Sequence, residues 1–208
     1  MFGSKKEKKS IHGTTIITDC VEMKGNVKGC CAVHIDGTVY GDVEIEESVV
    51  IGQKGTVHGN VKSKKVIVSG MLNGSIVCDE LELMAKGEVS DKIEAKIIIS
   101  DGIMNADISA EESIHILQNA NVNSEQMKSK KITVEGSVKG NIIATQLLEI
   151  GKTGLVEGNM TVKNIKTEEG GRILGAMSSY MEVTKKPKPK NDNDLFKEEV
   201  KSVKEVLK

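Results

Sequence analysis

The four histidines are the first residues to examine for catalysis, because imidazole is the commonest general acid or base near neutral pH. His34, His58 and His115 each flank an apolar residue that we expect to point inward, so their rings are predicted to point outward. His12 lies in the N-terminal leader. No serine or acidic residue stands at a spacing that would complete a catalytic pair, so we expect no catalytic residue and no small-molecule substrate.

The four cysteines do not have the spacing of a metal or redox site. Cys20, Cys30, Cys31 and Cys78 form no CxxC pair and share no histidine cluster, so we expect neither a metal nor another cofactor. In a reducing compartment they remain thiols. The simplest interpretation is that they are strand residues that behave as small apolar groups.

Composition and charge favour a regular structure with a narrow aliphatic core. Aromatic residues make up 2% of the 208 residues, and 21 glycines against 2 prolines indicate tight turns rather than disorder. Residues 1–10 carry a net charge of +3, residues 184–208 carry +3, and the middle carries −7. An acidic body does not indicate a nucleic-acid partner. No apolar run suits a signal peptide or a membrane span, so we expect a cytoplasmic protein.

A short unit recurs along the chain, in which apolar residues alternate with other residues and glycines stand at fixed offsets. Ile35–Val43, Val68–Ile76 and Val134–Ile142 follow the pattern apolar-x-Gly-x-apolar-x-Gly-x-apolar, and longer units such as 51–61 alternate with them. The central apolar residue recurs about every 17 residues. These ten residues are Met23, Val39, Val57, Leu72, Val89, Met104, Val122, Val138, Val156 and Ile173.

This repeat predicts an all-β fold, a single-domain parallel β-helix over residues 14–183. Val and Ile that alternate with polar residues are typical of strands, and about seventeen residues suit one circuit of a three-sided solenoid of about ten turns. Residues 62–74 resemble residues 128–140, which indicates duplication of whole turns. A single turn cannot bury its own apolar side chains, so the two ends are expected to be open.

The units resemble the bactofilins, small bacterial cytoskeletal proteins. The resemblance rests on IDGTVYGDVEIEESVVIGQKGTVHGNVKSKKVIVSGMLNGSI and on ITVEGSVKGNIIATQLLEIGKTGLVEGNM, and it covers about residues 14–180. It implies a non-enzymatic scaffold that assembles end to end into filaments without nucleotide. It also implies that the filament positions cell-envelope or cell-wall proteins and so influences cell shape.

The chain departs from that family in two respects. Its array is longer than is usual in the family, and the glycine corner is lost in the middle, where Asp91, Ala106 and Ser124 occupy the expected positions. We expect the central turns either to be irregular or to mark the seam of a duplicated domain.

Two other functions are compatible with a β-helix. A hexapeptide-type β-helix acyltransferase would need a strict six-residue period and a protruding loop, and units separated by 15 to 18 residues break that period. A monomeric β-helical binding module would favour a secretion signal and exposed aromatic residues, and the sequence shows neither.

The basic leader, residues 1–13, resembles a short membrane-targeting peptide found in some bactofilins. Apolar side chains can enter the interface while lysines meet anionic lipid on the inner face of the cytoplasmic membrane. The residues expected to make this contact are Met1, Phe2, Lys5, Lys6, Lys8 and Lys9. The alternative is an unstructured, solubilising leader.

The C-terminal segment contains a Lys/Pro linker, residues 184–193, and a predicted short amphipathic helix, residues 194–208. Its apolar residues are Leu195, Phe196, Val200, Val203 and Leu207. A helix of this length is marginal alone in water. Three outcomes are therefore open: it folds back as a cap on the last turn, it docks onto a partner protein or membrane, or it stays disordered.

The expected partner is a second copy of the chain, joined through the terminal turns by β-augmentation and aliphatic contact. At the leading end the polymerisation interface is predicted to contain Ile16, Ile17, Val21 and Met23. At the trailing end it is predicted to contain Ile173, Leu174, Met177 and Tyr180.

Overall fold

The computed structural model describes residues 13–181 and, in that range, contains twenty strands and no helix. Strands β1 to β8 are Thr15–Ile17, Glu22–Lys24, Val27–Gly29, Val33–Ile35, Thr38–Tyr40, Val43–Ile45, Ser48–Ile51 and Thr56–His58. Strands β9 to β15 are Val61–Val68, Met71–Asn73, Ile76–Leu83, Glu88–Ser100, Ile103–Ile116, Asn121–Val134 and Ser137–Ile150. Strands β16 to β20 are Leu155–Glu157, Met160–Val162, Ile165–Thr167, Arg172–Leu174 and Met177–Ser179.

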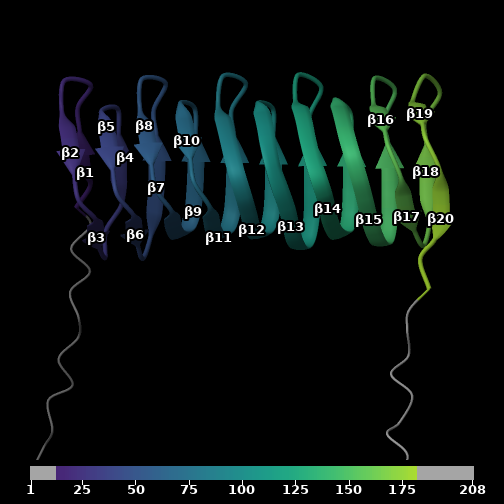
Figure 1. Ribbon diagram of the computed structural model, residues 1–208, viewed down its shortest axis with the longest axis horizontal. Coiled ribbons are helices and arrows are strands. Elements are labelled where there is room, and N and C mark those ends of the chain that lie inside the picture. The colour runs from purple at the N-terminus through teal and green to yellow at the C-terminus, as the bar shows by residue number, and fades with distance from the viewer. Residues whose placement is uncertain (1–12, 182–208) are drawn as a thin grey trace, which may run out of the picture.

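The strands form three parallel ladders that wind around one axis (Figure 1). Face A begins with β1, which pairs with β4; face B begins with β2, which pairs with β5; and face C begins with β3, which pairs with β6. The long strands β12 to β15 bend around the corners and contribute to all three faces. One circuit through the three faces is called a coil here. The predicted parallel β-helix of about ten coils is confirmed.

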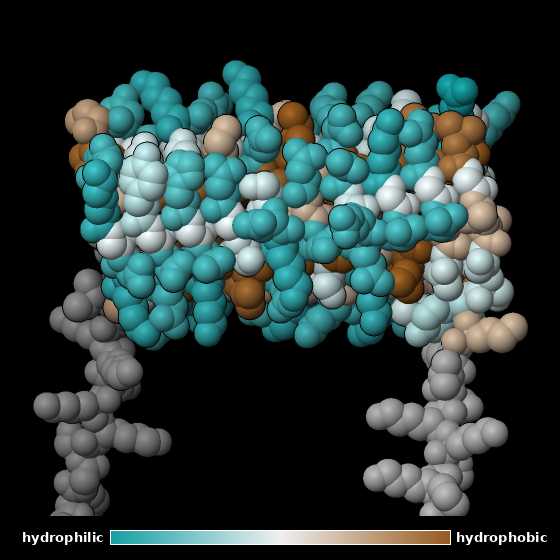
Figure 2. Space-filling view, viewed as in Figure 1, coloured by the Kyte–Doolittle hydropathy of each residue, from teal (hydrophilic) through white to brown (hydrophobic). Residues whose placement is uncertain are grey.

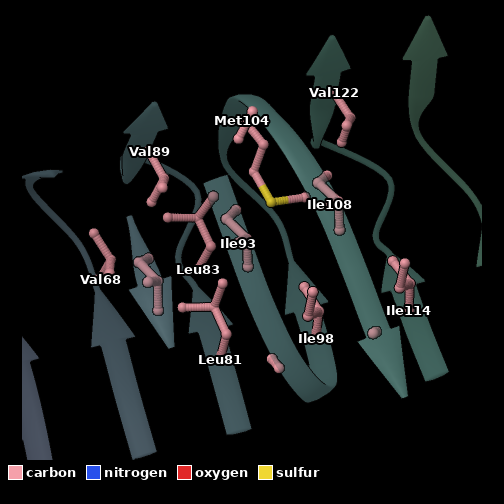
Figure 3. Close-up of a cluster of buried hydrophobic side chains, with 14 of the residues drawn as sticks. Val68, Leu81, Leu83, Val89, Ile93, Ile98, Met104, Ile108, Ile114 and Val122 are labelled. Atoms are coloured by element: carbon pink, nitrogen blue, oxygen red, sulfur yellow. The ribbon is translucent and has the colours of Figure 1, made fainter. Parts of the chain in front are cut away.

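The core is a set of continuous aliphatic columns along the axis. The ten central residues of the repeat lie in one column of face B, since each pairs in register with the next from Met23 and Val39 to Val156 and Ile173. The eight interior members are fully buried. Figure 3 shows how Val89, Met104 and Val122 of this column point inward toward side chains from the other faces. Burying each such side chain stabilises the fold by about 1.5–3 kcal/mol.

Loops of two lengths connect face A to face B. Four-residue loops at 18–21, 52–55, 84–87 and 117–120 alternate with two-residue loops at 36–37, 69–70, 101–102 and 135–136. Figure 1 shows them as taller and shorter loops along one edge of the rod. The alternation ends at the C-terminal side, where 151–154 and 168–171 are both four-residue loops. This accounts for the unequal spacing of the repeat units in the sequence.

Glycines stack at the corner between faces B and C, where the backbone needs a positive φ. Gly158 has φ of +135°, and a Cβ on it would collide with the carbonyl oxygen of Gly140 one coil below. Asparagine and aspartate side chains bond along the same corner: the Asn60 N–H donates to Asp42 Oδ1 over 2.9 Å. The corner therefore needs residues without a Cβ for close approach, with polar side chains beside them to bond the backbone.

The middle of the rod departs from this regularity, as the loss of glycine predicts. Asp91 keeps a positive φ of +91°, whereas Ala106 and Ser124 adopt ordinary backbone angles. The register shifts between β12 and β13, between β13 and β14, and between β14 and β15. In the same coils, Ser100 and Ser129 are buried, and their hydroxyls have no hydrogen-bond partner within the described residues. The central coils are thus irregular.

Substitution of glycine by alanine is expected to separate backbone strain from stacking. Gly158→Ala should cost about 1–3 kcal/mol more stability than Gly25→Ala, because only the former adds a steric collision. Gly25 is the matched control: its φ of +131° is nearly the same, and a Cβ there meets nothing within 4 Å. Urea unfolding measured by circular dichroism compares the two variants. Equal destabilisation would contradict the stacking explanation.

Candidate functional site: the two open ends of the solenoid

Both ends of the described solenoid have an unpaired strand edge on every face. In the leading end, β1, β2 and β3 pair only with strands of the second coil. In the trailing end, β18, β19 and β20 pair only with strands of the coil before them. Edge strands carry rows of N–H and C=O groups that can pair with a strand from another chain. The ends are therefore the part of the described structure best suited to self-association.

The leading end exposes the N-terminal members of two inward columns. Met23 and Val27 pack against the core but remain half-buried, because no coil lies beyond them in the described residues. Ile17 is only 7% exposed, so its side chain covers part of the core at the open end of the rod. The predicted residues Ile17 and Met23 thus lie in the inward columns of the first coil.

The trailing end also exposes apolar side chains of the inward columns. Met177 is 54% exposed and Ile165 is 36% exposed, although both occupy inward columns whose interior members are buried. Ile173 is half-buried and packs against the core. The predicted residues Ile173 and Met177 therefore lie on the open cross-section.

The other four predicted interface residues lie at the rims. Ile16 pairs in register with His34 on the outer side of face A and is 64% exposed, and Leu174 lies on the outer side of face B at 51% exposure. Val21 is in the loop 18–21, and the Tyr180 N–H donates to the Val162 carbonyl at the corner after β20. Their role in polymerisation stays a prediction. Sequence reasoning missed Val27 and Ile165, which alignment of every column, rather than only the central one, would have found.

The predicted residues of both tails, 1–12 and 182–208, lie outside the described residues. These include all the membrane-contact residues and all the apolar residues of the C-terminal helix named above. Within residues 13–181, no helix is long and apolar enough to cross a membrane.

The flanks of the rod are predominantly hydrophilic. Figure 2 shows hydrophilic side chains over most of one flank, with hydrophobic side chains at both extremities and in scattered spots between. Ion pairs join neighbouring coils, such as Lys96 Nζ to Asp79 Oδ1 at 2.8 Å and Lys131 Nζ to Glu149 Oε2 at 3.1 Å. The Lys131 and Lys166 ammonium groups lower the pKa of Glu149. Such surface pairs contribute little to stability but keep the flank charged and hydrated.

The three histidines within residues 13–181, His34, His58 and His115, lie on the outer side of the strands, as predicted. His34 Nε2 is 2.9 Å from Asp36 Oδ2, and the His58 ring stacks on Tyr40 with centroids 4.9 Å apart. His34 and Asp36 line a shallow hollow of about 590 Å³ between the loops 18–21 and 52–55, which the Lys54–Asp19 ion pair joins at 2.7 Å. The His34–Asp36 contact and the Tyr40–His58 stack therefore orient side chains on the surface of the rod.

The cysteines fall into two environments. Cys20, Cys30 and Cys31 lie in the first coil, where Cys30 Sγ is 3.6 Å from Cys31 Sγ. Cys78 is buried in face C, and burial raises its pKa to about 12. Within residues 13–181, no cluster of three or more histidine, cysteine or acidic side chains could hold a metal ion.

A rod of stacked coils with an unpaired edge at each end is a building block suited to a polymer. Comparison with known families agrees: the chain matches the Bactofilin model, described as polymer-forming cytoskeletal, over residues 15–101 and again over residues 96–178. The chain belongs to the bactofilin family. This membership confirms the predicted resemblance and a structural rather than enzymatic role, and it disfavours the acyltransferase alternative.

One curated relative is Bactofilin BacO of Myxococcus xanthus (strain DK1622), which is 28% identical over 75 residues. The match covers 36% of this chain and 60% of that relative's length. No solved structure matches the chain. The two family matches overlap at residues 96–101, beside the register shift between Ala95 and Ile97, so two successive regions of the array each match the family.

Thiol reactivity is expected to distinguish the two cysteine environments. Cys78 should not react with an aromatic disulfide reagent at pH 8 in the folded protein, because both its raised pKa and its burial keep thiolate away from the reagent. Cys20, which is exposed, should react readily. Mass spectrometry of the labelled peptides measures both, and unfolding in guanidinium should make Cys78 react. Rapid labelling of Cys78 in the folded protein would contradict its placement in the core.

Proposed function

We propose that copies of this chain polymerise end to end through their terminal coils, and that the filament positions cell-envelope proteins on the inner face of the cytoplasmic membrane. The observation that carries the first part is the loss of burial at the ends of the inward columns. Met177 and Ile165 are exposed although every interior member of their columns is covered by the next coil. A second copy would supply the missing coil.

End-to-end contact would satisfy two requirements at once. The open strand edges need partners for their N–H and C=O groups, and the half-buried Met23, Val27 and Ile173 need apolar contacts. A short ladder of three strands on each side would provide both. The flank has neither of these needs, because its strands are already paired and its side chains are mainly charged.

The tails extend the proposal to the membrane. The lysines of the leader would meet anionic lipid while Phe2 enters the interface, each basic residue adding about 1 kcal/mol near the surface. One leader would bind weakly, but a filament that carries many would bind by avidity. The amphipathic segment 194–208 would either cap the trailing end or bind an envelope protein.

Polymerisation is expected to fail when a charge is placed on the open cross-section. Ile173→Arg should leave the solenoid folded but lower the fraction that pellets on ultracentrifugation at least about tenfold, because the joint would have to desolvate a guanidinium. Ile103→Arg is the matched control, since Ile103 is exposed on the outer side of face B, far along the rod from either end. Negative-stain microscopy without nucleotide should show filaments of the parent and of the control.

Persistent filaments of Ile173→Arg would overturn joining through the trailing cross-section. Circular dichroism checks that both variants keep their β-sheet content. Loss of filaments in Ile103→Arg as well would indicate that joining uses the flank rather than the ends.

Membrane binding is expected to depend on the leader lysines. Changing Lys5, Lys6, Lys8 and Lys9 to Gln should abolish flotation of filaments with anionic phospholipid vesicles, because about 1 kcal/mol is lost per lysine and per copy. The matched control changes four lysines of the C-terminal linker, Lys185, Lys186, Lys188 and Lys190, to Gln. Equal flotation of the two variants would show that the leader does not contact the membrane.

A further inference from the structure

Three of the four cysteines belong to the first coil, the one that forms the leading end. Cys20 lies in the loop 18–21, whereas Cys30 and Cys31 lie at the corner that joins face C to face A. Cys30 is exposed and Cys31 is half-buried. The corner follows β3 directly in the chain, and β3 is an edge strand of the leading end. On its other side the corner is held to the second coil, where the Glu46 N–H donates to the Gly29 carbonyl.

The same corner carries charge in the coils that follow. In register with Cys30–Cys31, six successive coils alternate between acidic and basic side chains. These residues are Glu46–Glu47, Lys64, Asp79, Lys96, Glu111–Glu112 and Lys130. The first coil differs from these six coils because it places two thiols where they place ionised groups, whereas the next coil along places the uncharged Thr145 and Gln146 there.

Thiols suit a joint that excludes water better than ionised side chains do. The hydrogen bond between the Cys30 and Cys31 thiols, and to a smaller extent the nearby Glu46 carboxylate, raise the pKa of Cys30 above its ordinary value, which favours the neutral thiol. A neutral cysteine behaves as a small apolar side chain, whereas burying an unpaired carboxylate or ammonium is costly. Half-buried Val27 lies on the same strand edge and extends the apolar surface.

We propose that Cys30 and Cys31 line the joint between the leading coil and a second copy of the chain, so that assembly shields their thiols from solvent. This inference rests on the proposed end-to-end assembly. It identifies Cys30 and Cys31 as side chains of the joint at the leading end, and it implies that modification of these thiols would weaken the joint.

The test measures maleimide labelling in filaments of a Cys20→Ser variant that also carries Ser109→Cys. A thiolate sulfur adds to the ring double bond, and the adjacent carbon takes a proton from water. Ser109 is exposed on the outer side of face C in the body of the rod, so the cysteine introduced there reports a flank thiol. Peptide mass spectrometry gives the rate at each position, and unreactive Cys78 confirms that the protein is folded.

In filaments, Cys30 is expected to react at least about tenfold more slowly than the introduced flank cysteine, a ratio that corresponds to a joint closed most of the time. Val27→Arg, which places a charge on the leading cross-section, should restore the Cys30 rate to that of the flank. Conversely, alkylation of Cys30 before assembly should lower the yield of pelleted filaments.

Filaments in which Cys30 reacts as fast as the flank cysteine would overturn this inference and leave end-to-end assembly standing. Slow Cys30 labelling that Val27→Arg does not relieve would also overturn it, because the shielding would then come from within the chain. If the parent protein forms no filaments, both the assembly proposal and this inference fail.

Discussion

No coil of this molecule is stable alone. Fixing the backbone of about seventeen residues costs roughly 1–2 kcal/mol per residue, and the few inward side chains of one coil recover that cost only when a coil on each side covers them. The strand N–H and C=O groups impose the same condition, because in a parallel ladder each strand needs a neighbour above and below. Every interior coil satisfies both conditions within the chain. Among residues 13–181, the first and last coils satisfy them on one side only.

This constraint separates the surface into two chemical regions. The flanks have paired strands, charged columns and shallow polar hollows, and they remain hydrated. The ends have unpaired strands and partly exposed aliphatic side chains, with thiols in place of charges at one corner of the first coil. A protein that belongs to a polymer-forming family and concentrates its unsatisfied groups at two ends has a physical reason to join there.

The fold could be predicted from the sequence because the repeat encodes it directly. Met23 to Ile173 recur once per coil, and the strict alternation of Val and Ile with polar residues defines which side points inward. The ends were harder to predict. Ile16 and Leu174 are apolar but lie on the outer side, since position in the strand, not residue type, decides direction. Ile165 was missed because only the central column was aligned, although its polar neighbours Asn164 and Lys166 fit the alternation that marks an inward residue.

The two loop lengths give the rod two periodicities. Its core repeats with each coil, about 4.8 Å along the axis, whereas the edge between faces A and B repeats with every second coil, about 9.6 Å. The edge also loses phase at its C-terminal side, where two long loops follow each other (Figure 1). A molecule that bound along this edge would meet long loops at regular intervals. Because two long loops follow each other only near the C-terminal side, it could also distinguish the two directions of the rod.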